Sequence, residues 1–208
     1  VDEVIYDCLN LDNPKSFFLF AGAGSGKTRT LVNVLRKIKR NYAEQLRYSK
    51  QKVAVITYTN NACDEIKQRL GNDPLFKVST IHSFVWDLIK FYNLDIRERL
   101  RISLSDDILD LNEKQLKGRL GTKASSDRER QIKSKTEKLS HLDEIKQFTY
   151  NPNGDNLTRQ SLSHSQVINI GVHFLKDKPL MQQILVRNYP ILLIDESQDT
   201  VNELIDAF

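Results

Sequence analysis

Apolar runs alternate with amphipathic stretches over the first ninety residues of the chain. A short continuous apolar run is typical of a strand buried in a parallel sheet, whereas apolar residues that recur every three or four positions indicate a helix. The sequence therefore predicts strands at 17–20, 53–57 and 76–79. It predicts helices at about 28–48, 61–70 and 81–92. This alternation favours an α/β fold, a parallel sheet with helices on both faces.

The pattern changes between about 95 and 180, where charges crowd together and no strong strand is indicated. Gly118, Gly121 and the turn at 151–154 punctuate polar segments that favour helix. A last apolar run at 191–194 must rejoin the sheet that began near the N-terminus. We therefore expect one domain made of residues 1–94 and 181–208, interrupted by an inserted, mainly helical subdomain at 95–180.

The strand predicted at 17–20 runs into a glycine-rich loop that opens a helix. In this order the loop amides can surround a β-phosphate, the Lys27 amine can reach the β- and γ-phosphates, and the Thr28 hydroxyl can bind Mg²⁺. The helix dipole favours the same anion. The expected ligands of ATP are Ala21, Gly22, Ala23, Gly24, Ser25, Gly26, Lys27, Thr28 and Arg29. A glycine-rich turn that binds nothing is the alternative, and the position between strand and helix argues against it.

A second half of a triphosphate site follows the apolar run 191–194, which continues directly into Asp195 and Glu196. Such a run predicts a strand buried on both faces of a parallel sheet, with the two acids at its carboxyl end. Ligands of open α/β sheets bind at that edge. We expect Asp195 to hold Mg²⁺ through water and Glu196 to orient and deprotonate the attacking water. Alone, the pair could equally be a solvated strand end.

Composition sets outer bounds on the kind of protein. With 39% hydrophobic residues the chain can form a core, and its formal charge of +4 is a mild bias towards polyanions such as nucleic acid. The apolar stretches are too short to cross a bilayer and the start has no signal-peptide pattern, so we expect a cytoplasmic protein without membrane contact. Cys8 and Cys63 are isolated and are interpreted as packing residues.

Both ends of the sequence suggest a piece of a longer protein. The chain begins with Val1 rather than Met, and the apolar spacing of its last eight residues is that of an unfinished amphipathic helix.

The segments between the two halves of the site resemble a known family. Thr57-Tyr58-Thr59-Asn60-Asn61-Ala62-Cys63, followed by a helical pattern, is similar to the strand-to-helix motif of the UvrD, Rep and PcrA helicases. Residues 78–84 and 195–200 resemble two further motifs of these helicases, and the loop at 21–28 has their usual form, Ala21 included. Asn61, Cys63 and Ser197 depart from the family pattern without touching a phosphate ligand.

This resemblance implies a superfamily 1A helicase that moves 3′ to 5′ along single-stranded DNA, driven by ATP hydrolysis between two RecA-like domains. The chain matches the first RecA-like domain of the P-loop NTPase class. The second domain, with its arginine fingers, is not among these residues, so the chain alone is expected to be nearly inactive as an ATPase. No Gln precedes Gln45 to serve as the family's adenine-reading residue. Single-stranded DNA and a single-strand to duplex junction are the implied partners, and the oligomeric state is open.

Motif positions also suggest a DNA path. Tyr58 could stack on a base, or it could be an ordinary core aromatic; the flanking Thr57 and Asn60 favour the DNA role. Thr80 and His82, with Ser83, could donate to phosphates at a helix start, or Thr80 and Ser83 could only cap that helix. Gln198 could sense the γ-phosphate and assist catalysis, or it could be a surface amide.

Two questions stay open at this level. The mixed charges of 123–146 suit a solvated helix, and alternatively a contact with duplex DNA. The motifs also suit the motor of a RecB-like or AddA-like helicase-nuclease, or a nucleotide-dependent binding module that is not a motor.

Overall fold

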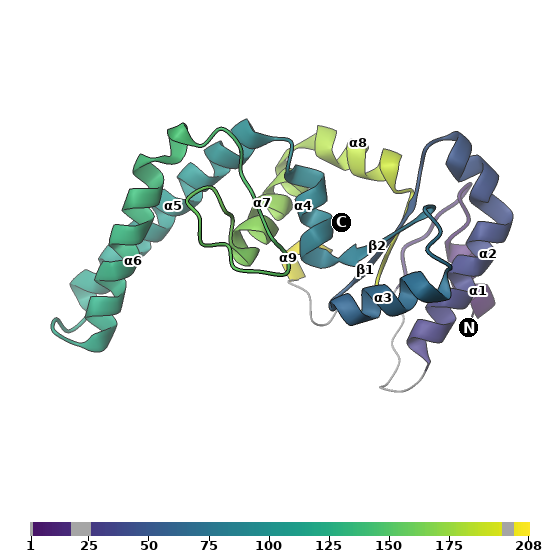
Figure 1. The fold of residues 1–208 in the computed structure, drawn as a ribbon, viewed down its shortest axis with the longest axis horizontal. Helices are drawn as coiled ribbons and strands as arrows, with labels where there is room; N and C mark the ends of the chain where they lie inside the picture. Colours follow the sequence, from purple (N-terminus) through teal and green to yellow (C-terminus); the bar gives the residue numbers. More distant parts are fainter. Residues whose placement is uncertain (1, 18–25, 197–201) are drawn as a thin grey trace. The chain divides into compact units, whose positions relative to one another are not determined.

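The computed structural model describes residues 2–17, 26–196 and 202–208. They form two compact units, of which the first joins Val1–Phe84 to Leu175–Phe208 and the second is Val85–Phe174. We call them the sheet unit and the helical unit (Figure 1). Two helices, α4 and α7, each contribute residues to both.

Helices and strands alternate in the sheet unit as the apolar pattern predicts. Its elements are α1 (Asp2–Cys8), α2 (Lys27–Tyr48), β1 (Val53–Thr57), α3 (Asn60–Arg69), β2 (Phe76–Thr80), the start of α4 (Ile81–Ile89), α8 (Pro179–Asn188), β3 (Ile191–Ile194) and α9 (Asn202–Ile205). The strands predicted at 53–57, 76–79 and 191–194 are confirmed. Of the strand predicted at 17–20, Phe17 is not in a strand and residues 18–20 lie outside the described residues.

The three described strands are parallel in the order β2-β1-β3. Val53 lies opposite Phe76 on one side and opposite Ile191 on the other. Every residue of β1 is buried. In β3 only Ile191 is buried, and Leu192, Leu193 and Ile194 are half-buried. The expectation that β3 is buried on both faces is therefore wrong for three of its four residues.

Both faces of β1 are covered. Val53 and Val55 point into an apolar cluster with Val32, Leu35 and Ile38 of α2. Ala54 and Ile56 are also fully buried but do not belong to that cluster, as the two-residue period of a strand requires for the opposite face. The sheet unit is thus a parallel sheet flanked by helices, which confirms the predicted α/β class.

The helical unit is built on an antiparallel helix pair. It contains the end of α4, α5 (Asn93–Lys117), α6 (Lys123–Ser140), the 3-10 helix η1 (Leu142–Glu144) and most of α7 (His164–Asp177). Gly121 adopts φ +75° in the turn between α5 and α6, and Thr122 caps α6 by accepting from the Ser125 amide at 3.2 Å. The Arg97 guanidinium on α5 donates to the Leu142 and Ile145 carbonyls and so fixes the chain that leaves η1.

No helix in the described ranges is both long and apolar enough to cross a membrane.

Asp73 ties α2 to the turn before β2. Its carboxylate lies 2.6 Å from the Lys39 amine and 3.4 Å from Arg47, accepts from the Leu75 amide, and its side chain is only 7% exposed. The hydrogen bond from Lys39 lowers the pKa of Asp73, against the opposing effect of burial. A lowered folded-state pKa stabilises the fold above the unfolded pKa of about 3.9, and this contribution is lost as pH falls through the folded value.

We therefore expect Asp73→Asn to lower the free energy of unfolding at neutral pH by about 1–3 kcal/mol. The variant should also lose less stability than the parent when pH is lowered below about 4. Urea unfolding at several pH values measures both. Asp64→Asn is the matched control, because Asp64 is 77% exposed and 3.9 Å from Lys67. If the free energy of unfolding changed with pH in the same way for the parent and for Asp73→Asn, the stabilising role assigned to the Asp73 carboxylate would be contradicted.

Gly171 allows α7 to approach α4 closely. A Cβ at this position would lie 2.2 Å from Cγ1 of the fully buried Val85, well inside van der Waals contact. Gly171→Ala should therefore destabilise the helical unit by about 1–3 kcal/mol despite the better helix propensity of Ala. Adding Val85→Ala should restore part of the loss by making room. Equal melting temperatures for the parent and Gly171→Ala would refute the close approach.

Candidate nucleotide and nucleic-acid site

Parallel register brings the three strand ends to one edge of the sheet. Thr57 of β1 lies opposite Thr80 of β2, and Ile56 lies opposite Ile194 of β3. The Asp195 amide donates to the Ile56 carbonyl at 2.8 Å, so the ladder extends one residue past β3. The residues that follow the strands therefore leave the sheet at a common carboxyl edge, where ligands of open α/β sheets bind.

The first turn of α2 belongs to the same edge. Residues 49–52 alone join α2 to β1, and the two pack through Leu35, Leu46 and Val53, so α2 must run antiparallel to β1. Its last turn lies at the amino end of β1 and its first turn at the carboxyl end. Figure 1 allows this reversal of direction to be followed from α2 into β1.

The start of α2 is arranged for an anion. Gly26 has φ +82° and supplies no side-chain cap, and no heavy atom of the described residues lies within 4 Å of the position a Cβ would take. The first turn contains no acid and carries Lys27 and Arg29. Cations are disfavoured at a helix N-terminus by about 0.3–1 kcal/mol unless an anion balances them. Lys27 and Thr28 are half-buried and Arg29 is exposed. The other expected phosphate ligands, Ala21 to Ser25, lie outside the described residues.

The two acids after β3 differ in conformation. Asp195 is half-buried and accepts from the Glu196 amide through Oδ1 at 3.1 Å. Glu196 is exposed and has φ +57°, in the left-handed region that costs a non-glycine residue about 1–2 kcal/mol. Strain of this kind is concentrated at functional sites. Gln198 lies outside the described residues.

The turn after β1 separates a buried threonine from an exposed tyrosine. The Thr57 hydroxyl donates to the Thr59 carbonyl at 3.0 Å and lies 2.9 Å from the Cys63 sulfur, and its side chain is 1% exposed. Burial raises the pKa of the Cys63 thiol. Tyr58 is 50% exposed, so it is not a core aromatic. Thr59 caps α3 by accepting from the Ala62 amide, and Asn60 is exposed at the start of that helix.

The turn after β2 contains a helix cap. Thr80 is 9% exposed, donates to the Ser83 hydroxyl at 2.9 Å and accepts from the Ser83 amide at 3.4 Å. This is the capping role that the sequence left as an alternative for Thr80 and Ser83. His82 is half-buried in the first turn of α4.

The described candidate residues at this edge fall into two groups, one with accessible side chains and one with buried side chains. Lys27, Asp195, Glu196, Tyr58 and Asn60 reach one edge with side chains at least partly accessible. Thr57 and Thr80 sit at that edge but are buried, with their hydroxyls engaged inside the protein. Sequence reasoning missed the Thr57–Cys63 contact and the left-handed Glu196. Only the departure at Cys63 from the family pattern hinted at the former.

Lys and Arg side chains of α6 are engaged within the helical unit. The Lys135 amine lies 2.6 Å from Asp107 of α5, the Arg128 guanidinium donates to Gln115, and Lys138 donates to the Ser161 carbonyl and to Gln166. Burial lowers the pKa of Lys138. These contacts agree with a helix stabilised by its own neighbours.

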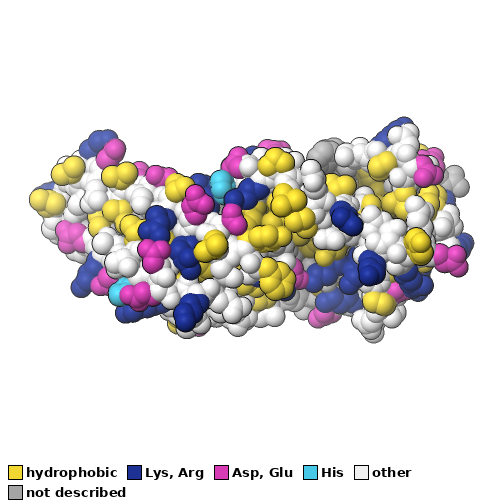
Figure 2. Space-filling view, turned by 90° about the horizontal axis from the view of Figure 1, so that it is seen from above, with side chains coloured by type: hydrophobic (Ala, Val, Ile, Leu, Met, Phe, Trp, Pro, Cys, Tyr) yellow, Lys and Arg dark blue, Asp and Glu magenta, His cyan; other side chains and the backbone are white. Residues whose placement is uncertain are grey.

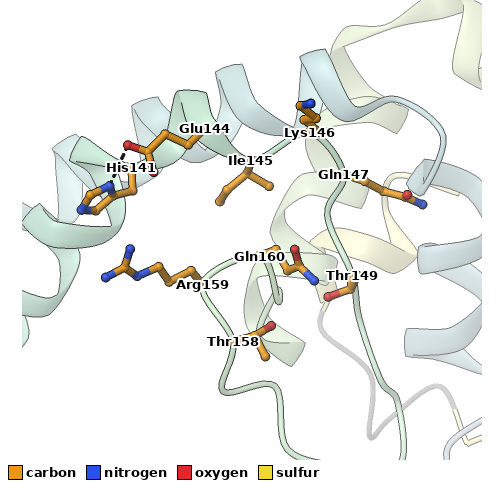
Figure 3. Close-up of a pocket in the computed structure, with 9 residues that line it drawn as sticks. All are labelled: His141, Glu144, Ile145, Lys146, Gln147, Thr149, Thr158, Arg159 and Gln160. Atoms are coloured by element: carbon orange, nitrogen blue, oxygen red, sulfur yellow. Dashed lines mark hydrogen bonds and ion pairs between the residues drawn. The ribbon is translucent and has the colours of Figure 1, made fainter.

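A cavity of about 520 Å³ lies in the helical unit, and none of its lining residues is predicted to bind ATP or DNA (Figure 3). It is lined by the stretches 144–147 and 158–160 together with His141 and Thr149. Most of these side chains are exposed, and His141 pairs with Glu144 at 3.0 Å. The cavity is open to solvent.

A parallel sheet flanked by helices, with a cationic helix start and two acids at its carboxyl edge, is an α/β arrangement consistent with a RecA-like P-loop domain. The family model of the UvrD/REP helicase N-terminal domain matches residues 9–207, and the chain belongs to this family.

Individual relatives agree with that family. The chain is 29% identical to Gabija protein GajB of Bacillus cereus (strain HuB5-5) over 259 aligned residues, covering 94% of this chain and 38% of the relative. ATP-dependent DNA helicase Rep of Escherichia coli (strain K12) is 35% identical over 43% of this chain and 14% of its own length. An ATP-dependent helicase/nuclease subunit of Bacillus mycoides (strain KBAB4) is 33% identical over 47% of this chain and 10% of its own length. The chain thus spans well under half of each relative.

Exposure of Tyr58 allows a test of base stacking. Tyr58→Ala should weaken binding of a labelled single-stranded oligonucleotide by about 1–3 kcal/mol, with little sequence preference. It should change the melting temperature little, because half of the side chain is already in water. Tyr48→Ala is the matched control, since Tyr48 is 92% exposed at the opposite edge of the sheet. Unchanged affinity in Tyr58→Ala would remove Tyr58 from the DNA path.

Proposed function

We propose that this chain is the N-terminal ATP-binding domain of an ATP-dependent DNA helicase of the UvrD type, which binds ATP·Mg²⁺ and moves 3′ to 5′ along single-stranded DNA. Family membership supports the class. The observation that carries the proposal is the common carboxyl edge, where the acids after β3 and the exposed Tyr58 follow parallel strands and the first turn of α2 lies at the same edge.

The described residues fit a nucleoside triphosphate. Gly26 leaves open space where a Cβ would stand, and the first turn of α2 offers a positive dipole end and no acid. In the proposal Lys27 holds the β- and γ-phosphates, and the amides of residues 21–29 surround them. Thr28 and Asp195 hold the magnesium ion. Bound ATP·Mg²⁺ supplies the phosphoryl group whose transfer to water drives movement.

We assign the role of general base to Glu196. Its carboxylate would orient the attacking water and accept a proton from it, while Asp195, one residue earlier, stays with the metal. The left-handed backbone of Glu196 directs its side chain differently from a continuing strand, which supports separate roles for the two acids. Gln198 would contact the γ-phosphate and so couple the presence of ATP to the residues that bind DNA.

Two kinds of residue are assigned to the DNA path. Tyr58 would stack on a base, and Asn60 and His82 would donate to the phosphate backbone. Thr57 and Thr80, whose hydroxyls are internally bonded, would hold the turns that present these side chains. A single-strand to duplex junction is the proposed substrate, and a second RecA-like domain is the proposed partner within the whole protein.

A helicase-nuclease motor is the second candidate. It is favoured by the similarity to the helicase/nuclease relative from Bacillus mycoides, which extends over nearly half of the chain. A nuclease assay on the whole protein separates the two candidates, because both share the motor chemistry.

Two substitutions should separate phosphate binding from proton transfer in the whole protein. Lys27→Ala removes the cation from the β- and γ-phosphates, so both tight ATP binding and hydrolysis should be lost. Glu196→Gln keeps the phosphate and metal ligands, so ATP should still bind while DNA-stimulated hydrolysis falls about 10²–10⁴-fold. Nucleotide affinity by calorimetry and steady-state ATPase rates give the two readouts.

Asp64→Asn is the control for the loss of one carboxylate charge, since Asp64 lies on the exposed side of α3. Hydrolysis by Glu196→Gln at the parental rate would assign the base to another residue. An ATPase that no single-stranded DNA stimulates would favour a nucleotide-dependent binding module over a motor.

A further inference from the structure

The positive charge of the chain is concentrated in one element of the sheet unit. Residues 26–52, which are α2 and its flanks, contain nine of the 31 basic residues and one of the 27 acidic residues. The remainder of the sequence has 22 basic and 26 acidic residues and is therefore net negative. The small net charge of the whole chain therefore includes one strongly basic helix, which the rest of the chain partly balances.

Four arginines of α2 share one line along its surface. Arg29, Arg36, Arg40 and Arg47 are spaced by seven, four and seven positions, which on an α-helix keeps them within about 20° of a common line and spreads them over about 27 Å. All four are exposed, whereas Val32, Leu35 and Ile38 of the same helix face the core. We call this line the arginine stripe.

Part of the stripe is held in place by neighbouring elements. The Arg36 guanidinium donates to the Arg69 carbonyl at the end of α3 at 2.9 Å, and Arg47 lies 3.4 Å from Asp73. Arg29 and Arg40 make no ion pair with the acidic residues that the structure describes. Lys39, on the edge of the stripe, also reaches Asp73. Figure 2 shows Lys and Arg side chains distributed along the whole face in view, together with Asp and Glu side chains.

An ordinary solvated helix is charged differently. On α5, Lys114 and Lys117 each pair with an acid four residues earlier. On α2, Arg36 and Arg40 are instead like charges at the same spacing, which destabilises a helix. Glu44, the one acid of α2, forms no ion pair with the stripe within the described residues. A bound polyanion would remove this repulsion.

We propose that the arginine stripe beyond the first turn of α2, at Arg36, Arg40 and Arg47, binds the phosphate backbone of duplex DNA at a surface separate from the carboxyl edge of the sheet. Guanidinium groups bind phosphate oxygens through two donors at once. A straight, rigid row of cations matches the regular phosphates of a duplex, which carries one charge per about 1.7 Å of axis.

The stripe lacks the features that other partners need. Asn33 and Glu44 are the exposed residues nearest to the line, so it presents no apolar or aromatic anchor of the kind that protein interfaces require. Single-strand sites combine positive charge with stacking rings, and no ring lies within the stripe. Interfaces with duplex DNA are polar and strongly positive.

A triple substitution tests the surface without touching the first turn of α2. Arg36→Gln, Arg40→Gln and Arg47→Gln together should weaken binding of a labelled random-sequence duplex of two helical turns, about 20 base pairs, by 10-fold or more at low salt. The slope of log affinity against log salt should decrease by about 1–3, because each lost phosphate contact contributes about 0.9. Fluorescence anisotropy over a salt series measures both.

Three comparisons make the result specific. Lysine at the same three positions should retain most of the duplex affinity, because the charge remains. Arg130→Gln, Lys176→Gln and Arg187→Gln together remove the same charge from exposed positions elsewhere and should leave duplex affinity near the parental value. Melting curves of all variants establish that the compared proteins are folded.

Several outcomes would overturn the proposal. They are unchanged duplex affinity in the folded glutamine variant, an equal loss in the control triple, and tighter binding of polyglutamate than of duplex. If single-stranded DNA competes fully for the stripe and Tyr58→Ala weakens duplex binding equally, the stripe belongs to the proposed single-strand path. The proposed helicase function can fail independently of this proposal, because duplex binding by the stripe needs neither ATP nor Lys27. In that case ATP hydrolysis would be absent while the arginine substitutions still weakened duplex binding.

Discussion

Parallel pairing on both sides of β1 is the constraint on which the remaining structure depends. It forces β2 and β3 to end where β1 ends, and it forces each connecting helix to return antiparallel to the strands. Residues as distant in sequence as Lys27, Tyr58 and Asp195 are thereby brought to one edge. The helical unit can be inserted between β2 and β3 without altering this edge, because α8 returns the chain to the sheet unit before β3.

Much of the fold could be predicted from the sequence because strands buried on the faces of a parallel sheet leave continuous apolar runs. The bounds of β1 and β3 follow directly from Val53–Thr57 and Ile191–Ile194. The incomplete burial of β3 could not be predicted, because a run of apolar residues does not show what packs over the two faces of its strand. The Thr57–Cys63 contact was equally hidden, since it depends on how tightly the chain turns from β1 into α3.

Two local rules are broken at the carboxyl edge. Glu196 adopts a conformation that favours glycine, and the first turn of α2 bears cations where acids would be more stable. By contrast, α3 and α6 begin with threonine caps, and the ends of α3 and α5 carry basic residues. The sequence could reveal the cations but not the backbone angle, because torsion angles depend on the tertiary ladder that ends at Asp195.

The contacts between α2 and the C-terminal end of α3 help to fix the turn at 58–60, which precedes the N-terminal end of α3. Arg36 holds the Arg69 carbonyl and Asp73 holds Lys39 and Arg47, while Thr59 and Cys63 anchor the opposite end of α3 beneath β1. The turn at 58–60 therefore lies between a strand and a helix that are both fixed. Ordering one residue of a loose backbone costs about 1–2 kcal/mol of entropy, and here folding has already met that cost. A molecule that contacts the turn at 58–60 therefore has only side-chain rotations left to restrict there.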